Sequence, residues 1–288
     1  MLSQLAKVVQ EPYRLRGHLN HRLTGINKYY RTISSPDGFP GQNHMDKEWD
    51  VLLLLDATRY DIYCDVVSEE AQLCRSVASM SNEFIRNTFQ GRKLHDTVYL
   101  TDNPYAALIN DEVFYHLRMV EMATNNQTIP PREMGKRAKD IASEFPDKRL
   151  IVHFMQPHDP YFGPSGCNLP TQRFWQKARA GKVPVSQLNA AYRENLKLVA
   201  DIAFDVAESV TGKTIISSDH GELLGDRGYP IPIREFGHPE GYYRPELVHV
   251  PWHNLGGEKR AVVAESPITD FKAGEQTVES RLESLGYI

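Results

Sequence analysis

The sequence is poor in cysteine, and it lacks both long apolar runs and a strong excess of one charge. Its 288 residues include three cysteines, Cys64, Cys74 and Cys167, which are too few and too scattered for a disulfide framework or a zinc knuckle. We therefore expect a reducing, cytoplasmic location, peripheral to a membrane at most. No stretch of about 18 apolar residues occurs, so no membrane-spanning helix is expected, and polar residues interrupt any signal-peptide core near the start.

The charge is nearly balanced, with 33 Lys and Arg against 37 Asp and Glu and a net charge of −4. Such a balance creates no overall field that attracts nucleic acid, so no nucleic-acid partner is expected. Hydrophobic residues make up 41% of the chain, which is enough for a packed core. The length fits one large α/β domain or two small ones.

Residues 1–32 differ from the rest because they carry six Lys and Arg but a single acid, Glu11. Leucine and isoleucine recur there at helical spacing, at Leu15, Leu19, Leu23 and Ile26. We expect an amphipathic helix that packs this stripe on its own domain; the alternative is a helix that binds anionic lipid, as a peripheral membrane contact, or a protein partner. A turn-rich linker follows, so the predicted organisation is a basic arm and linker at 1–40 and an α/β domain at 41–288.

Short apolar runs alternate with helical patterns along the remainder of the chain. The runs predict strands at residues 49–55, 97–100, 150–155, 214–216 and 247–250, and the periodic segments predict helices at 82–88, 132–145 and 185–210. Continuous apolar runs are typical of strands that are buried on both faces of a parallel sheet. The predicted fold is therefore α/β, a three-layer αβα sandwich with a mostly parallel sheet.

Carboxylate and imidazole groups end three of these runs. Asp56 follows the first, His153 lies near the end of the third with His158 beyond it, and Asp219 and His220 follow the fourth. Ligands of open α/β sheets bind at this edge. Asp56, Asp219 and His220 are therefore expected to hold one divalent metal ion, and Ca, Mg, Mn and Zn all accept such ligands. The structural alternatives are an N-cap for Asp56 and a plain strand-to-loop turn for Asp219.

These motifs resemble the sulfatase-like branch of the alkaline phosphatase superfamily, in particular its short archaeal members. The resemblance rests on Asp56-Ala57-Thr58-Arg59-Tyr60-Asp61, residues 153–161, Ser218-Asp219-His220-Gly221-Glu222, Gly237-His238-Pro239, Val250-Pro251-Trp252 and residues 279–288. It covers about residues 49–288 and implies an alkaline phosphatase-like fold. It also implies a metal-dependent hydrolase of sulfate or phosphate esters that acts through a serine nucleophile. The substrate is then an anionic ester, carried by a carbohydrate or a lipid.

The resemblance places the nucleophile at a helix N-terminus within residues 76–91, where Ser79 and Ser81 compete. Counting back from Gly91 selects Ser81, which we prefer, whereas a lipoteichoic acid synthase-like register selects Ser79. The structural alternative for Ser81 is an N-cap of the helix expected from Asn82.

The sulfatase signature Cys/Ser-x-Pro-x-Arg is absent, because the chain reads Ser-Asn-Glu-Phe-Ile from Ser81. Formylglycine modification is therefore not expected, and an unmodified serine suits phosphoryl chemistry at least as well as sulfate-ester hydrolysis. Ala57 stands where a second acid commonly follows the first ligand, which favours one metal over two.

The resemblance also implies roles for three histidines. His158 contacts the leaving group or a non-bridging oxygen, and it could act as a general acid because imidazole titrates near neutral pH. His153 is expected to bind the substrate, with a place in the core as its alternative. His238 is expected to complete the site from a distant loop, as a substrate-binding or second-metal group.

Two further side chains lie inside the motifs. Arg59 is expected to clamp an anionic group of the substrate, or else to pair with Asp61. Glu222 is expected to orient His220. The alternatives to a hydrolase are a transferase that passes a phosphoryl-linked group to a glycan or lipid, and a catalytically silent binding protein that keeps the fold.

Overall fold

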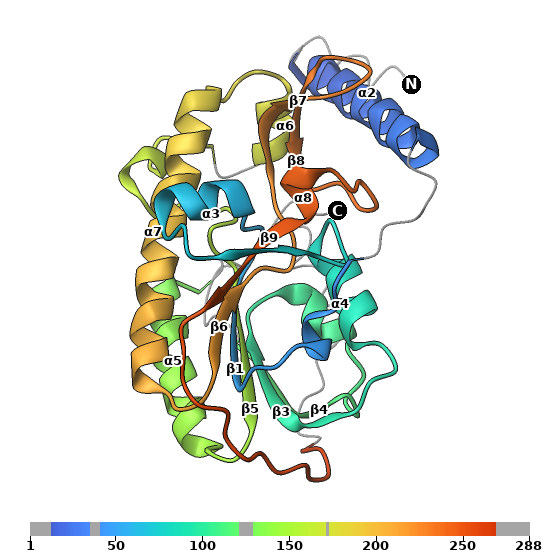
Figure 1. The fold of residues 1–288 in the computed structure, drawn as a ribbon. Coiled ribbons are helices and arrows are strands. Elements are labelled where there is room, and N and C mark those ends of the chain that lie inside the picture. Colours follow the sequence, from blue (N-terminus) through green and yellow to red (C-terminus); the bar gives the residue numbers. More distant parts are fainter. Residues whose placement is uncertain (1–12, 35–40, 121–128, 171–172, 269–288) are drawn as a thin grey trace.

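Seven strands form the central sheet, in the order β2-β9-β6-β1-β5-β3-β4 (Figure 1). The structure, a computed structural model, describes residues 13–34, 41–120, 129–170 and 173–268. The strands are β1 (Val51–Leu55), β2 (Gln72–Arg75), β3 (Leu94–Thr101), β4 (Phe114–Met119), β5 (Arg149–Phe154), β6 (Thr214–Ser217) and β9 (His249–Asn254). Strands β6, β1, β5, β3 and β4 pair in parallel, whereas β9 runs antiparallel to both β6 and β2. The predicted mostly parallel sheet is confirmed.

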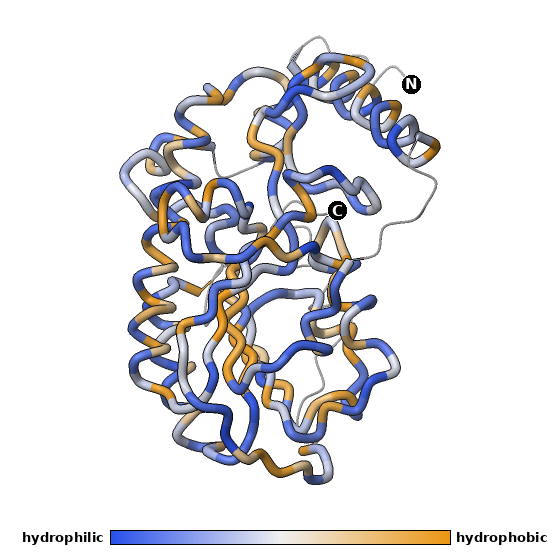
Figure 2. The backbone as a smooth tube through the Cα atoms, viewed as in Figure 1, coloured by the Kyte–Doolittle hydropathy of each residue, from blue (hydrophilic) through white to orange (hydrophobic). Residues whose placement is uncertain are grey.

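Helices cover both faces of the sheet, which makes three layers (Figure 1). One face carries α3 (Tyr60–Val66), α5 (Pro131–Glu144) and α7 (Val185–Ser209), and the other carries α4 (Ser81–Phe89) and the 3-10 helices η1 (His44–Asp46) and η2 (Pro104–Leu108). Alternate residues of β1 divide between the two layers: Leu53 packs in the core of α5 and α7, and Leu54 packs with Phe84. Both cores are apolar, so every residue of β1 is buried, and Figure 2 shows the hydrophobic central strands.

Above the strand ends lie smaller elements. These are α2 (Tyr13–Ser34), η3 (Pro164–Gly166), α6 (Phe174–Arg179), α8 (Pro245–Val248) and a two-stranded sheet of β7 (Leu223–Arg227) and β8 (Arg234–Gly237). Helix α2 packs against α6 and β8. Among the described helices, none is both long enough and apolar enough to span a membrane.

The helix expected in the basic arm is present as α2, but the expected packing of its leucine stripe is wrong. Leu15, Leu19 and Ile26 are 60%, 55% and 50% exposed, whereas the buried residues are Gly17, Thr24 and Asn27. The physical reason lies in the surface beneath the helix, which offers backbone carbonyls and a buried carboxylate to amide side chains. Most of the expected linker lies outside the described residues, as do residues 279–288.

Most of the expected elements are found close to their predicted bounds. The expected helices correspond to α4, α5 and α7, and the first four expected strands correspond to β1, β3, β5 and β6. The run at 247–250 is divided, because α8 takes residues 245–248 and β9 begins at His249. Helix α3, strands β2 and β4 and the β7–β8 hairpin were not predicted.

Candidate active site

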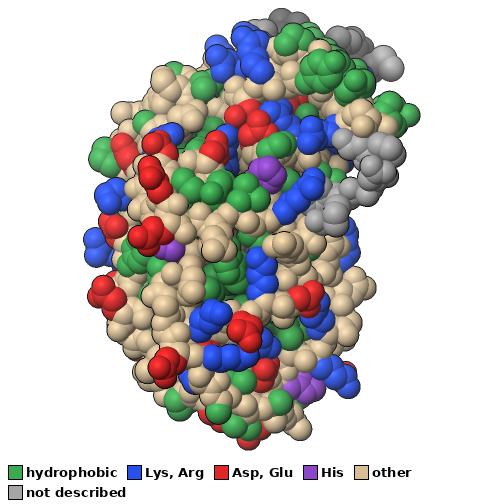
Figure 3. Space-filling model, viewed as in Figure 1, with side chains coloured by type: hydrophobic (Ala, Val, Ile, Leu, Met, Phe, Trp, Pro, Cys, Tyr) green, Lys and Arg blue, Asp and Glu red, His purple; other side chains and the backbone are tan. Residues whose placement is uncertain are grey.

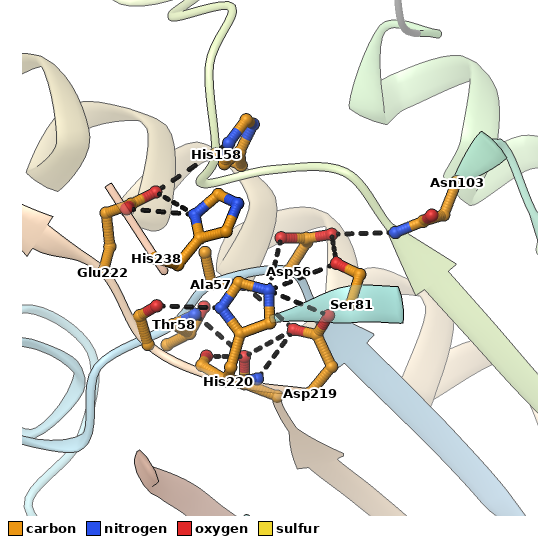
Figure 4. Close-up of polar contacts among 12 residues, drawn as sticks. Asp56, Ala57, Thr58, Ser81, Asn103, His158, Asp219, His220, Glu222 and His238 are labelled. Carbon is orange, nitrogen blue, oxygen red and sulfur yellow. Dashed lines mark hydrogen bonds and ion pairs between the residues drawn. The ribbon is translucent and has the colours of Figure 1, made fainter. Parts of the chain in front are cut away.

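Three neighbouring strands deliver the side chains expected from the motifs to one buried site. Strand β1 lies between β5 and β6, with Leu54 opposite His153 on one side and Ser217 on the other. Asp56 and Asp219 therefore emerge side by side where β1 and β6 end, and both are fully buried, as is His153. Figure 4 shows Asp56 and Asp219 among side chains that they contact.

Asp56, Asp219 and His220 form the group expected to hold a metal ion, because their ligand atoms all lie within 4.8 Å of one another. Asp219 Oδ1 accepts hydrogen bonds from the backbone N–H of Ala57 (3.1 Å) and of His220 (2.8 Å). Its second oxygen, Oδ2, has no hydrogen-bond donor among the described residues. Asp219 is therefore held in place by one oxygen and presents the other to the site.

Asp56 is arranged in the same way. Its Oδ2 accepts from Asn103 Nδ2 (3.0 Å) and from Ser81 Oγ (3.1 Å), whereas its Oδ1 has no donor within the described part of the chain. A buried acceptor that lacks a donor is costly, and a cation is the partner that satisfies a buried carboxylate. Asn103 was not predicted, although it follows a strand that was.

His220 presents one nitrogen to the same space. Its Nδ1 lies 2.8 Å from the carbonyl oxygen of Gly221, which can only accept, so Nδ1 carries the proton. Nε2 then has its lone pair directed toward Ser81 Oγ at 3.2 Å. Burial lowers the pKa of His220 to about 4, which keeps the ring neutral as a metal ligand must be.

The electrostatics of the two carboxylates also favour a cation. Burial and the Asp219 charge raise the pKa of Asp56 well above its ordinary value. Burial opposes ionisation of Asp219 too, but His220 and His153 outweigh it and hold the pKa of that carboxyl below its ordinary range. Two carboxylate oxygens and one imidazole nitrogen thus fit a divalent cation, and the donor types suit Ca, Mg, Mn or Zn.

The two candidate serines have different surroundings. Ser81 Oγ contacts Asp56 and His220, and Figure 4 shows it pointing between them. Ser79 Oγ instead donates to Glu83 Oε2 and lies 3.0 Å from the carbonyl oxygen of Pro239. Ser79 is therefore bound into the start of α4, away from the metal-ligand group.

The N-cap interpretation of Ser81 is wrong by one position. Helix α4 begins at Ser81 itself, and its N-cap is Met80, which makes no side-chain capping bond. The Ser81 hydroxyl, which as an N-cap would bond to the backbone of its own helix, crosses to β1 and β6 instead. Its N-terminal position still places it where the helix dipole favours an anion.

A second buried group adjoins the first. His158, Glu222 and His238 offer ligand atoms that lie within 4.8 Å of one another. His238 Nδ1 lies 3.1 Å from Glu222 Oε1, and the His238 ring lies 4.7 Å from that of His220 between centroids. Glu222 therefore contacts His238, whereas His220 is oriented by the Gly221 carbonyl, so the expectation that Glu222 orients His220 is wrong.

Burial also shifts the pKa values of the side chains in this second group. Burial raises the pKa of Glu222 to about 8 and lowers that of His238 to about 3. Burial would lower the pKa of His158 as well, but Asp159 and Glu222 outweigh it and raise that pKa. His158 is thus the imidazole of this group that holds a proton most readily.

His153 lies against the two carboxylates of the site. Its Nδ1 bonds to the Tyr99 hydroxyl at 2.8 Å, and its Nε2 lies 3.7 Å from Asp56 Oδ2 and 3.6 Å from Asp219 Oδ2. Burial lowers its pKa, but the Asp219 and Asp56 charges outweigh this and raise it. His153 is therefore buried and also part of the site's charge balance.

Arg59 is occupied by other side chains. Its Nε donates to Asp61 Oδ1 at 2.9 Å, and its Nη1 lies 3.0 Å from both oxygens of Asp226. Its backbone N–H donates to the Tyr192 hydroxyl, which in turn donates to the carbonyl of Ala57. The structure thus shows the alternative that was expected, the ion pair to Asp61, and the role of Arg59 as a substrate clamp stays a prediction.

Comparisons with known proteins show likeness in fold only. No protein-family model matches the chain, and no curated protein matches it. The C-terminal periplasmic domain of the phosphoethanolamine transferase EptC from Campylobacter jejuni is 14% identical, with a TM-score of 0.47 over 70% of this chain and 76% of that one. A 2-O GAG sulfatase is 11% identical, with a TM-score of 0.46 over 76% and 65%.

A third solved structure, a protein in the alkaline phosphatase superfamily from Vibrio parahaemolyticus, is 13% identical, with a TM-score of 0.42 over 74% of this chain and 61% of that one. The structures similar to this chain thus include a phosphoethanolamine transferase domain, a sulfatase and a member of the alkaline phosphatase superfamily.

Proposed function

We propose that the protein is a metal-dependent hydrolase of phosphate or sulfate esters and that Ser81 is its nucleophile. The observation that supports this most directly is the position of Ser81 Oγ, within 3.2 Å of both an Asp56 oxygen and His220 Nε2. A serine hydroxyl needs a neighbouring acceptor or cation to become a nucleophile, and this one has the acceptors already in place. Ser79 Oγ has acceptors too, Glu83 Oε2 and the Pro239 carbonyl, but neither belongs to the group of residues that would hold the cation.

The reaction begins when Ser81 Oγ attacks the phosphorus or sulfur atom and its proton passes to Asp56 Oδ2, which already accepts its hydrogen bond. A divalent cation held by Asp56, Asp219 and His220 would neutralise the ester oxygens and lower the pKa of the serine hydroxyl. The bond to the alcohol breaks as the bond to Ser81 forms, and the leaving oxygen takes a proton. We propose His158 as the donor, because its raised pKa keeps more of it protonated near neutral pH. Water then cleaves the ester on Ser81.

His153, His238 and Glu222 have supporting roles in this proposal. His238 and Glu222 lie hydrogen-bonded beside the metal-ligand group and would position the substrate's leaving side. His153 lies behind Asp56 and Asp219 and offsets their charge. In this proposal His153 therefore stabilises the negative charge of the two carboxylates and does not itself bind the substrate.

Phosphate esters suit this site better than sulfate esters. Sulfate-ester hydrolysis by the usual route uses a formylglycine, and the sequence from Ser81 lacks the signature for that modification. An unmodified serine attacks phosphorus with the help of a cation that neutralises the non-bridging oxygens. A transferase that passes the group to a glycan or lipid shares this first step and differs only in the acceptor.

The location and the organisation of the chain stay part of the proposal. Cys64, Cys74 and Cys167 are all described and all carry free thiols, as a reducing, cytoplasmic compartment requires. We also propose the division into a basic arm at 1–40 and an α/β domain at 41–288. The balanced charge supports the absence of a nucleic-acid partner.

An activity panel with two matched serine variants tests the proposal. The full chain, loaded in turn with Ca, Mg, Mn and Zn, is given aryl phosphate, aryl phosphodiester and aryl sulfate. We expect Ser81→Ala to lose about a thousandfold or more in kcat, because the covalent route is removed. Ser79→Ala has the same chemistry two residues away and should stay within about tenfold of the wild type.

Three outcomes would contradict the proposal. An equal loss of kcat in both variants would contradict Ser81 as the nucleophile. A loss of kcat in Ser79→Ala alone would make Ser79 the nucleophile. A wild type that binds none of the four metals and turns over none of the esters would favour a catalytically silent binding protein. Turnover without and with an added alcohol separates hydrolysis from transfer, because a hydrolase releases inorganic phosphate with water as the only acceptor, whereas a transferase turns over only when the alcohol is present.

A further inference from the structure

Helix α2 has an apolar side that faces away from the protein. Residues 15, 19, 22, 26, 29 and 33 recur every three or four positions, which places them on one side of a helix. The apolar members are exposed: Leu15 60%, Leu19 55%, Ile26 50%, Tyr29 68% and Ile33 56%. Figure 3 shows hydrophobic side chains gathered over α2 at the upper right of the molecule. We call this set of five residues the α2 stripe.

The opposite side of α2 is fixed to the domain by polar contacts. Asn27 donates to the Ile231 carbonyl at 2.9 Å and to Glu235 Oε1 at 2.8 Å, and it accepts from the backbone N–H of Ile231 at 2.8 Å. Asn20 donates to the Arg234 carbonyl. Turning the α2 stripe inward would break all of these bonds and bury apolar groups against a carboxylate. The outward orientation of the stripe is therefore specified by the sequence.

The charge of α2 indicates what covers the stripe. Helix Tyr13–Ser34 contains five Lys and Arg and no Asp or Glu. Arg22 lies within the stripe and Arg16 lies at its edge, and both are exposed. Arg16 also lines a groove of about 600 Å³ between α2 and the β7–β8 hairpin, whose walls include Arg227 and Arg234. Two exposed arginines, Arg16 and Arg22, thus adjoin the stripe, and their aliphatic stems can lie along apolar surface with the charge outward.

We propose that α2 lies flat on an anionic lipid surface, with the α2 stripe inserted at the boundary between headgroups and acyl chains. A helix with leucine, isoleucine and tyrosine on one side and only basic charges around them has the pattern of an interfacial helix. A second copy of the chain is a poorer partner, because its helix α2 carries the same positive charges beside the stripe and would repel this one. The proposal concerns binding alone, so it stands or falls independently of the reaction at Ser81.

Vesicle flotation of the full chain tests the proposal. The probes are vesicles of pure phosphatidylcholine and vesicles that also contain phosphatidylglycerol. The test variant replaces three residues of the stripe, and the control replaces three equally exposed apolar residues elsewhere. The two sets are Leu15→Gln/Leu19→Gln/Ile26→Gln and Leu73→Gln/Leu108→Gln/Val263→Gln, the latter 48%, 59% and 46% exposed in the wild type. Far-UV circular dichroism and the melting temperature check that each variant is folded.

We expect the wild type and the control variant to float with the anionic vesicles and the stripe variant to lose at least about tenfold in partitioning. A second variant, Arg16→Gln/Arg22→Gln, should weaken binding to anionic vesicles and reduce its salt dependence. Failure of the wild type to float, or equal flotation of wild type and stripe variant, would overturn the proposal. So would sedimentation showing that the stripe variant turns an oligomer into a monomer, because a second copy would then be the partner.

Discussion

Replacing Asp56 by asparagine removes one of two carboxylates that are fully buried with ligand atoms within 4.8 Å of each other. Two unit charges at that separation repel by about 3.5 kcal/mol at an effective dielectric constant of about 20. His153, at 3.7 Å from Asp56, offsets part of this repulsion. Without a metal, the wild type either retains the remaining repulsion between the two carboxylates or keeps Asp56 protonated. The raised pKa of Asp56 agrees with the second of these.

Asparagine keeps the contacts that Asp56 makes with the protein. Its amide oxygen can still accept from Asn103 and Ser81 in the place of Oδ2, and its amide nitrogen takes the place of Oδ1, which lies 3.8 Å from His220 Nε2. In a metal-free buffer we therefore expect Asp56→Asn to be more stable than the wild type by about 1–3 kcal/mol. That difference raises the melting temperature by roughly 2–4 °C per kcal/mol in a chain of this size.

A metal ion should reverse the order. At a free metal concentration of about 100 Kd, binding stabilises the wild type by about 2.7 kcal/mol, whereas Asp56→Asn has lost a charged ligand and gains little. Melts in chelator and along a metal titration measure both effects. Asp226→Asn is the matched control, because Asp226 is also paired but with Arg59, outside the metal-ligand group. It should be less stable than the wild type under both conditions.

The reasoning is refuted if Asp56→Asn is less stable than the wild type in chelator. It is refuted equally if none of Ca, Mg, Mn and Zn raises the melting temperature of the wild type. If Asp226→Asn were also more stable than the wild type in chelator, the stabilisation would not be specific to the two facing carboxylates, Asp56 and Asp219. The reversal of order between the two buffers is the decisive result, because loss of a packing contact would lower stability in both.

Three further perturbations test other parts of the fold. Burial and Lys47 hold the pKa of His44 at about 4 against 6.5 in the unfolded chain, so folding favours the neutral ring. Stability should fall by on the order of 3 kcal/mol as the pH drops from about 6.5 to 4, and urea melts of His44→Gln should show a shallower fall. Asn27→Ala leaves a buried carboxylate without its amide partner, and we expect a loss of about 2 kcal/mol with faster amide hydrogen exchange in α2. Gly221→Ala places a Cβ 2.2 Å from the backbone oxygen of Glu246, so we expect it to abolish metal binding as measured by titration calorimetry. The control Gly25→Ala places its Cβ in open space and should leave metal binding unchanged.

The metal-ligand group was predictable because its signal is local and its geometry follows from the sheet. Strand β1 is a run of five apolar residues with a carboxylate immediately after it. Strand β6 is a shorter buried run, Thr214–Ser217, and Asp219 and His220 follow it after one further serine. Parallel strands that are neighbours in a sheet end at the same edge, so residues just past their ends must meet. Asp56, Asp219 and His220 needed no other information.

Other contacts depend on residues that are far apart in the sequence. The spacing of Leu15, Leu19 and Ile26 establishes a stripe, but the side of the helix that is covered depends on Ile231 and Glu235, more than 200 positions away. Strand β2 is four residues long and has one buried side chain, so it is too short to show the alternation of apolar and polar residues that predicts a strand. Asn103 belongs to a loop after β3, where its amide has the ordinary appearance of a turn residue.

The two serines show most clearly what a sequence leaves open. Ser79 and Ser81 both lie at the start of a helix, and the sequence resemblance allows either register. The choice depends on Glu83, whose carboxylate accepts from both the backbone N–H and the hydroxyl of Ser79 and so occupies that serine. Met80 is extended and the helix begins one residue later, which turns the Ser81 hydroxyl toward the ends of β1 and β6. The environment of each serine thus depends on where α4 begins, and helix bounds are what sequence patterns define least well.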